Sequence, residues 1–262
     1  MVRSLQDLYI GRNEGSHPMK RQPILEVIAV DAADARAAEQ GGADRIELVS
    51  AMSEGGLTPS VGIIEQVVSQ VTIPVYVMIR PHSRSFCYSA EDIRVMTQEV
   101  RMARELGASG IVVGALSEGG EVDLAAMASC LSEAQELGVT FHRAIDVSAS
   151  LSGTLHSIST LGQVERVLTS GGKRAAPEAI SELKQLHELS QALDITVMAG
   201  SGVTLDRIRD LVRQTGITEL HMGSGVRYEG SFHKPIHPQM VEEAKRHLLS
   251  AFQSTNDGSD TR

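Results

Sequence analysis

The sequence predicts an α/β protein of one domain, folded as a closed (β/α)8 barrel of the TIM type. Short apolar runs rich in β-branched residues alternate with longer segments of helical period between Ile24 and Met222, the pattern of a parallel sheet wound with helices. No linker-like stretch interrupts this alternation, which favours one barrel. An open doubly wound sheet is the alternative, but the GxGxxG fingerprint expected after its first strand is absent, since Asp31 and two alanines follow Val30.

Each predicted strand is a short apolar run, and each is followed by a segment whose apolar residues recur with helical spacing. The predicted strands span residues 24–30, 45–49, 75–80, 110–113, 139–142, 165–169, 195–199 and 219–222. The predicted helices span residues 32–40, 60–70, 90–106, 123–137, 152–161, 177–192 and 205–214, with a closing helix at 238–251. Glycine stands near the start of several strands, where a positive φ at a helix C-cap favours a residue without a side chain. These glycines are Gly42, Gly107, Gly138, Gly162 and Gly216.

The two ends of the chain fall outside the predicted barrel, which covers residues 23–252. Residues 1–22 are expected to form a mobile extension, because they mix charged residues and glycine without the apolar segment of a signal peptide. Met19, which opens a Lys-Arg segment ahead of the first strand, is an alternative start of the protein. Residues 253–262 are polar and are expected to be disordered.

Composition and charge exclude several classes of partner. The formal net charge is −9, with 24 Lys and Arg against 33 Asp and Glu, and only 3% of residues are aromatic, so nucleic acid is not an expected partner. No run of 18 apolar residues occurs, which argues against a membrane protein. The two cysteines, Cys87 and Cys130, lie far apart without CxxC spacing, which argues against a disulfide framework or structural zinc and favours a reducing, cytoplasmic location.

Polar residues occupy strand positions that a barrel places inside. If Leu25, Val27 and Ala29 face the helices, Glu26 points into the barrel. The same alternation turns inward Arg45, Glu47 and Val49 of the second strand, Thr140 and His142 of the fifth, and Glu219 and His221 of the eighth. Buried carboxylates must be paired or lie at a solvated mouth, because an unpaired buried charge costs several kcal/mol.

The candidate catalytic residues follow from this pattern, because catalytic groups of such barrels gather at the C-terminal ends of the strands. They are Glu26, Glu47, Arg80, His142, Arg143 and Asp146. For Glu26, which is early in its strand, a structural ion pair with an inward arginine is an equal alternative. Arg80 and His142 end their strands, which favours a functional role for both.

Glycine-rich loops follow the last three predicted strands. Backbone N–H groups ahead of a helix bind anions, and the loops after strands 7 and 8 of such barrels often hold phosphate. The candidate anion-binding residues are Ser170, Gly171, Gly200, Ser201, Gly202, Gly223, Ser224 and Arg227. Their grouping predicts a small anionic ligand.

Seven strings occur in an order that resembles one known family. They are ADRIEL (43–48), EGGLTPS (54–60), MIRP (78–81), FCYS (86–89), VTFHRA (139–144), RVLTSGG (166–172) and MAGSGV (198–203). Together they resemble the copper homeostasis protein CutC family over residues 24–227. The resemblance implies a cytoplasmic TIM barrel, often a dimer or larger homo-oligomer, that is linked to copper. It also places the family's polar mouth residues at the six candidate catalytic positions.

The sequence departs from this family at two places. Many members carry cysteine in the first two strands, where this chain has Ile28 and Val49, so the thiolates that favour Cu(I) are missing. The stretch after Arg80 and Pro81 also differs, because His82-Ser83-Arg84-Ser85 replaces an Arg-Gly-Gly-Asp-like sequence. Cys87, with His82 or Met78, is the remaining candidate copper ligand, although a buried, inert thiol is the simpler interpretation.

Three functions follow as hypotheses. The first is a CutC-like copper homeostasis protein that binds a copper ion directly or acts on copper tolerance indirectly. The second is an enzyme, an isomerase, lyase or hydrolase, that acts on a small anionic or phosphorylated metabolite without a nucleotide cofactor. The third is a barrel that binds such a metabolite without turnover.

Overall fold

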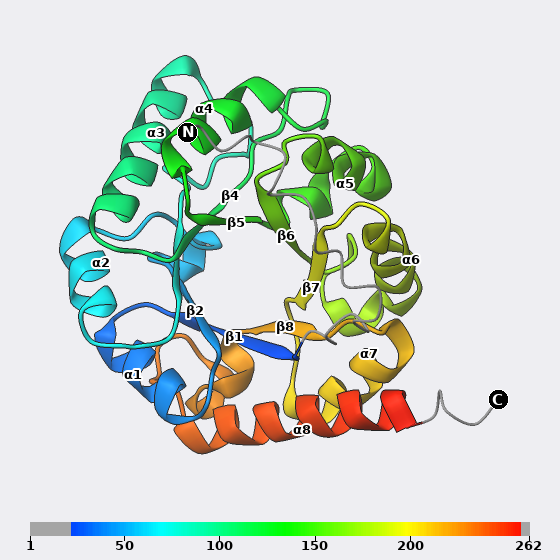
Figure 1. Cartoon of the computed structure of the whole chain (residues 1–262). Coiled ribbons are helices and arrows are strands. Elements are labelled where there is room, and N and C mark those ends of the chain that lie inside the picture. The colour runs from blue at the N-terminus through cyan, green and yellow to red at the C-terminus, as the bar shows by residue number, and fades with distance from the viewer. Residues whose placement is uncertain (1–21, 258–262) are drawn as a thin grey trace, which may run out of the picture.

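Eight parallel strands close into a barrel in chain order, and helices surround it (Figure 1). The computed structural model describes residues 22–257. The strands are β1 (Ile24–Ala29), β2 (Arg45–Leu48), β3 (Val75–Met78), β4 (Gly110–Val113), β5 (Gly138–Phe141), β6 (Val164–Thr169), β7 (Thr196–Gly200) and β8 (Glu219–Met222). Ile24 of β1 pairs with Glu219 of β8, which closes the ring. The predicted (β/α)8 barrel is therefore confirmed.

The helices of the described residues follow the strands in the predicted order. They are α1 (Ala32–Gln40), α2 (Val61–Val68), α3 (Ala90–Glu105), α4 (Leu124–Ala134), α5 (Leu151–Ser159), α6 (Ile180–Gln191), α7 (Ile208–Thr215) and α8 (Pro238–Asp257). Short 3-10 turns precede α6 at Ala176–Glu178 and α7 at Leu205–Arg207, where the predicted helices begin. None of the helices in the described part of the chain is both long enough and apolar enough to cross a membrane.

The ends of the barrel differ from the prediction at the C-terminal side. Helix α8 continues to Asp257, so the tail that was expected to be disordered from residue 253 begins inside this helix. Residues 1–21 and 258–262 lie outside the described residues, and so do the expectations that fall on them.

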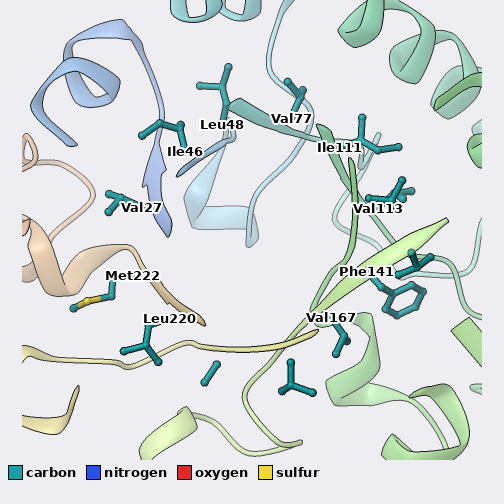
Figure 2. Packing of buried hydrophobic residues seen from close by; sticks show 14 of the residues in the cluster. Val27, Ile46, Leu48, Val77, Ile111, Val113, Phe141, Val167, Leu220 and Met222 are labelled. Carbon is teal, nitrogen blue, oxygen red and sulfur yellow. The ribbon is translucent and has the colours of Figure 1, made fainter. Parts of the chain in front are cut away.

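The side chains of the strands alternate as predicted between the helices and the barrel interior. Figure 2 shows Val27, Ile46, Leu48, Leu220 and Met222 pointing away from the barrel axis, toward the helices. A smaller apolar cluster forms on the inner face. It contains Ile28, Val49, Tyr76, Met78 and Val112. This register leaves the intervening polar side chains inside the barrel.

Two glycines make room for an aromatic ring at the start of the strands. A Cβ at Gly138 would lie 2.1 Å from Tyr76 Oη, and a Cβ at Gly110 would lie 2.4 Å from Tyr76 Cε1. Gly138 is the first residue of β5, so its predicted role as a helix C-cap is wrong. The other four predicted cap glycines do have positive φ. Glycine near the start of a strand therefore has one of two roles in this fold, a positive φ after a helix or room for a neighbouring ring, and the sequence pattern did not distinguish them.

We expect Gly138→Ala to lower the free energy of unfolding by about 1–3 kcal/mol, because the new methyl group overpacks against Tyr76. Gly138→Ala should lower the free energy of unfolding by less in a Tyr76→Phe background, because that variant lacks Tyr76 Oη, the atom nearest to the new methyl group. Urea unfolding of the four proteins of this cycle measures the coupling.

Gly62→Ala is the matched control, since Gly62 lies inside α2 and no neighbouring atom of the described residues comes within 4 Å of its ideal Cβ. This change should raise stability by up to about 1 kcal/mol. An equal cost of Gly138→Ala in both backgrounds would contradict the role assigned to the ring.

Candidate functional site

A pocket of about 220 Å³ opens at the C-terminal ends of the strands. Eight of the predicted site residues line it. They are Glu47, Arg80, His142, Arg143, Ser201, Gly202, Gly223 and Ser224. Apolar side chains, among them Ile28, Met78, Phe86 and Phe232, complete the walls. Side chains from separate βα repeats thus converge on one rim of the barrel.

Arg80 lies just after β3 and is held by the backbone of the loop that follows β2. Its Nη1 donates to the carbonyl oxygens of Glu54 and Gly56, each at 3.1 Å, and its guanidinium lies 4.7 Å from the centre of the Phe86 ring. Only 7% of the residue is exposed, and no carboxylate of the described residues forms an ion pair with it. Arg80 is therefore a buried positive charge without an anionic partner in the described protein.

His142 is a neutral hydrogen-bond donor at the end of β5. Its Nδ1 accepts the backbone N–H of Ala144 at 3.2 Å, so the proton of the neutral ring lies on Nε2, which has no partner in the described structure. Burial and the nearby charge of Arg80 lower the pKa of His142 to about 3. A buried neutral imidazole of this kind can polarise a carbonyl oxygen by donating a hydrogen bond.

Six ionisable side chains form a continuous column inside the barrel, which we name the charge column. From the pocket downward they are Glu47, His221, Glu26, Arg45, Glu219 and Arg166. Acidic and basic side chains alternate along the column. All six residues are at least nine-tenths buried.

The contact nearest the pocket is the longest in the charge column. His221 Nε2 lies 3.7 Å from Glu47 Oε2, whereas His221 Nδ1 lies 2.7 Å from Glu26 Oε1. Glu26 Oε2 accepts from Arg45 Nε at 2.5 Å. Glu219 Oε2 accepts from Arg45 at 2.8 Å and from Arg166 at 2.6 Å. The lower column is a closed set of two cations and two anions.

The two glutamates of the upper column have opposite electrostatics. Burial alone raises the pKa of Glu26, but the charge of Arg45 and the hydrogen bond with His221 outweigh it and lower this pKa to about 2. Burial raises the pKa of Glu47 to about 7, because the opposing charge of His221 compensates only in part. Glu47 Oε1 has no hydrogen-bond partner in the described structure. Glu26 is thus a fixed anion, and Glu47 can change its charge near neutral pH.

The structural alternative for Glu26 agrees with this geometry, since Glu26 is fully buried, pairs with Arg45 and does not line the pocket. Four residues of the column were not nominated from the sequence as site residues. Arg45 and Glu219 were predicted only to point inward. His221 was predicted to point inward but was given no role, and Arg166 follows from the same alternation within β6, where Leu168 also lines the pocket.

Asp146 occupies the cradle that was predicted to bind an external anion. Its carboxylate accepts from Thr169 Oγ1 at 2.6 Å and from the backbone N–H groups of Ser170 and Gly172 at 3.0 and 3.1 Å. Arg143 Nε donates to the same carboxylate at 2.8 Å. Asp146, Ser170 and Gly171 do not line the pocket. The loop after β6 is therefore satisfied by the protein's own carboxylate.

Arg227 also has an internal partner. Its guanidinium donates to Asp34 Oδ2 at 2.5 Å and to the carbonyl oxygens of Ile28 and Lys234, and 1% of the residue is exposed. These contacts fasten the loop after β8 to β1 and α1. Gly200 lies at the end of β7 outside the pocket lining. Neither residue is placed to bind the predicted anion.

The comparison with known proteins identifies the family. A family model described as the CutC family matches residues 24–226. The chain belongs to the CutC family. A family protein CutC from Pasteurella multocida is 42% identical over 205 residues, covering 78% of this chain and 83% of that protein. The copper homeostasis protein cutC homolog of Homo sapiens is 41% identical over 214 residues, or 79% of this chain and 78% of its own length.

A solved structure supports the same assignment. The crystal structure of a protein named as a copper homeostasis protein CutC, from Streptococcus agalactiae, matches with a TM-score of 0.72 and 29% identity over 77% of this chain and 98% of that chain. The family predicted from seven short strings is thereby confirmed, as is its barrel.

The described residues do not offer a set of ligands that suits the copper implied by the CutC name. In the described part of the chain, the one group of three His, Cys, Asp or Glu ligands whose atoms lie within 4.8 Å of one another is Glu26, Glu47 and His221. Both Glu26 oxygens already accept from Arg45 and His221. Oxygen and nitrogen donors beside a guanidinium do not suit Cu(I), which prefers thiolate and thioether sulfur.

Cys87 does not supply the missing sulfur. The residue is exposed, so its interpretation as a buried, inert thiol is wrong, and the buried cysteine is Cys130. Cys87 lies in a separate surface hollow and its thiol donates to the carbonyl oxygen of Ser117 at 3.2 Å, whereas Met78 lines the pocket. The two predicted sulfur ligands therefore do not share one site.

We expect Glu26→Gln and Glu47→Gln to change stability in opposite directions. The carboxyl of Glu26 has a pKa lowered from 4.5 to about 2, so it stabilises the fold above pH 4.5, by about 3 kcal/mol, and this stabilisation disappears as the pH falls toward 2. The carboxyl of Glu47 has a raised pKa, so its ionised form destabilises the fold increasingly from pH 4.5 to about 7.

Denaturant unfolding of both variants between pH 3 and 8 measures these effects. At pH 8 the Glu26→Gln protein should be less stable than wild type and the Glu47→Gln protein more stable. The two buried glutamates are matched controls for each other, and a shift of the same sign in both variants at pH 8 would contradict the assignment.

Proposed function

We propose that this member of the CutC family is an enzyme that carries out acid–base chemistry on a small anionic metabolite bound at the mouth of the barrel. The observation that carries the proposal is Arg80, a buried cation that lines the pocket without a carboxylate partner among the described residues. A buried charge without a partner costs several kcal/mol, and an anionic ligand would remove that cost. Guanidinium groups bind phosphoryl and carboxylate groups with charge-assisted hydrogen bonds.

The surrounding groups support the same class of ligand. Arg143 also lines the pocket, with 41% of its side chain exposed, although its Nε is paired with Asp146. The loops after β7 and β8 contribute Gly202 and Ser224 to the same rim. Glycine-rich backbone at this end of a barrel is a common location for phosphate.

The neutral His142 and the titratable Glu47 support turnover as well as binding. His142 Nε2–H can donate to a carbonyl oxygen of the substrate while Glu47, with a pKa near 7, takes or gives a proton. Isomerisation, aldol-type cleavage and hydrolysis use such groups without a nucleotide cofactor. We infer that the family's link to copper is indirect in this chain. Two unpaired cysteines support a reducing, cytoplasmic location.

We expect glycerol 3-phosphate or inorganic phosphate to raise the thermal unfolding midpoint of the full chain, because a ligand that binds only the folded state stabilises it. The Arg80→Gln variant should bind these probes at least tenfold more weakly by calorimetry. Arg84→Gln is the matched control, since the Arg84 side chain is 73% exposed and lies outside the pocket. Equal affinity in the Arg80→Gln variant, or no binding by either probe, would refute the anion site.

Turnover then separates an enzyme from a protein that only binds. In D2O, phosphorylated aldoses and ketoses should lose the proton next to their carbonyl group in the presence of wild-type protein, which proton NMR follows directly. Glu47→Gln should slow this exchange about 100-fold or more. Binding of these sugar phosphates without proton exchange would favour a barrel that binds a metabolite without turnover. Tight Cu(I) binding that Cys87→Ala abolishes would favour direct copper handling.

A further inference from the structure

His221 lines the pocket from β8 and is held from below by a buried anion. Its Nδ1 lies 2.7 Å from Glu26 Oε1, and Glu26 is itself fixed by Arg45 at 2.5 Å. Because Glu26 is a permanent anion at neutral pH, the hydrogen bond places a proton on His221 Nδ1. The other ring nitrogen, Nε2, is then free to gain or lose a proton on the pocket side, where Glu47 lies.

We propose that His221 and Glu47 are the acid–base pair of this pocket and that Glu26 is the positioning residue that holds the imidazole with Nε2 toward Glu47 and the substrate. This inference deepens the proposed function and rests on it for the substrate. It assigns the acid–base role to a histidine of β8 that the pocket chemistry described above did not use.

The two groups lie close enough together for one part of a substrate to contact both from the pocket side. His221 Nε2 and Glu47 Oε2 are 3.7 Å apart, too long for a direct hydrogen bond, and Glu47 Oε1 is buried without a partner. Both groups line the pocket. A substrate hydroxyl or acidic C–H placed on the pocket side of the pair would contact both groups, and catalytic hydrogen bonds are often long until a ligand is bound.

One turnover conserves protons and charge. Glu47 carboxylate takes a proton as a C–H or O–H bond of the substrate breaks, and the electron pair stays on the substrate. The His221 imidazolium gives its Nε2 proton to the substrate atom on which that pair ends. Glu47 is then neutral and His221 is neutral, and transfer of one proton from Glu47 back to His221 restores the starting state.

The charges around His221 permit this exchange near neutral pH. The groups that act on it are Glu26 from β1, Glu47 from β2 and Arg143 from the turn after β5, and Arg45 from β2 pairs with Glu26 behind the ring. Burial lowers the pKa of His221, but Glu47 and the hydrogen bond with Glu26 outweigh it and raise this pKa above its ordinary value. Since the pKa of Glu47 is also raised, the two interacting groups titrate as one unit.

Imidazole nitrogen NMR of the full chain, labelled with 15N-histidine, tests the proposal without any ligand. The His221 signals, identified by their loss in His221→Asn, should show a proton on Nδ1 throughout and a titration of Nε2 above the ordinary range of histidine. Glu47→Gln should weaken the proton affinity of the ring at least tenfold, because it removes the anion beside Nε2. Glu99→Gln is the matched control, since Glu99 bonds to Thr58 outside the pocket.

A neutral ring with its proton on Nε2, or a titration that Glu47→Gln leaves unchanged, would overturn the proposal. Glu26→Gln should remove the preference for Nδ1–H. That variant leaves Arg45 without one of its two anions, so Glu47→Gln carries the decision if Glu26→Gln does not fold. These spectra need no bound anion. A failed phosphate titration would therefore refute the proposed function, while the NMR result would still decide whether His221 and Glu47 share a titration.

Discussion

The ion pair between Glu26 and Arg45 is the interaction on which the interior of this barrel depends. Barrel interiors are usually filled by branched apolar side chains, yet here four fully charged groups and two titratable ones share that space. Glu26 links the two halves of the charge column, because one oxygen binds Arg45 and the other binds His221. Without that carboxylate, Arg45 would lose one of its two anions and the His221 imidazole would lose the partner of its Nδ1.

The interior is divided into a balanced part and an unbalanced part. Below Glu26, the two arginines and two carboxylates neutralise one another through hydrogen bonds of 2.5 to 2.8 Å. At the mouth, and within residues 22–257, Arg80 has no carboxylate partner, His142 has an unused donor and Glu47 has an unused oxygen. A rigid base with satisfied charges can hold unsatisfied groups in fixed positions, which is what preorganised chemistry requires.

The sequence predicted the barrel and the inward direction of Glu26, Glu47 and His142 because strand alternation is a local property with a period of two. It did not predict the partners of Asp146 or Arg227, because these are set by segments that approach only after folding, such as Asp34 from α1. Glycine patterns were ambiguous for a related reason. Gly138 makes room for Tyr76, a residue two strands away, and nothing in its neighbouring sequence distinguishes this from a helix cap.

The way Arg80 is anchored has a consequence for how this protein could diverge from its relatives. The two groups that hold Nη1 are main-chain carbonyls of Glu54 and Gly56, which every amino acid possesses. Apart from Gly55 and Gly56, whose φ angles are positive, the adjoining loop can therefore exchange side chains, and with them the shape of the rim, while the cation stays in place. Differences in that loop among CutC proteins would then change the shape of the rim around an arginine held in the same way.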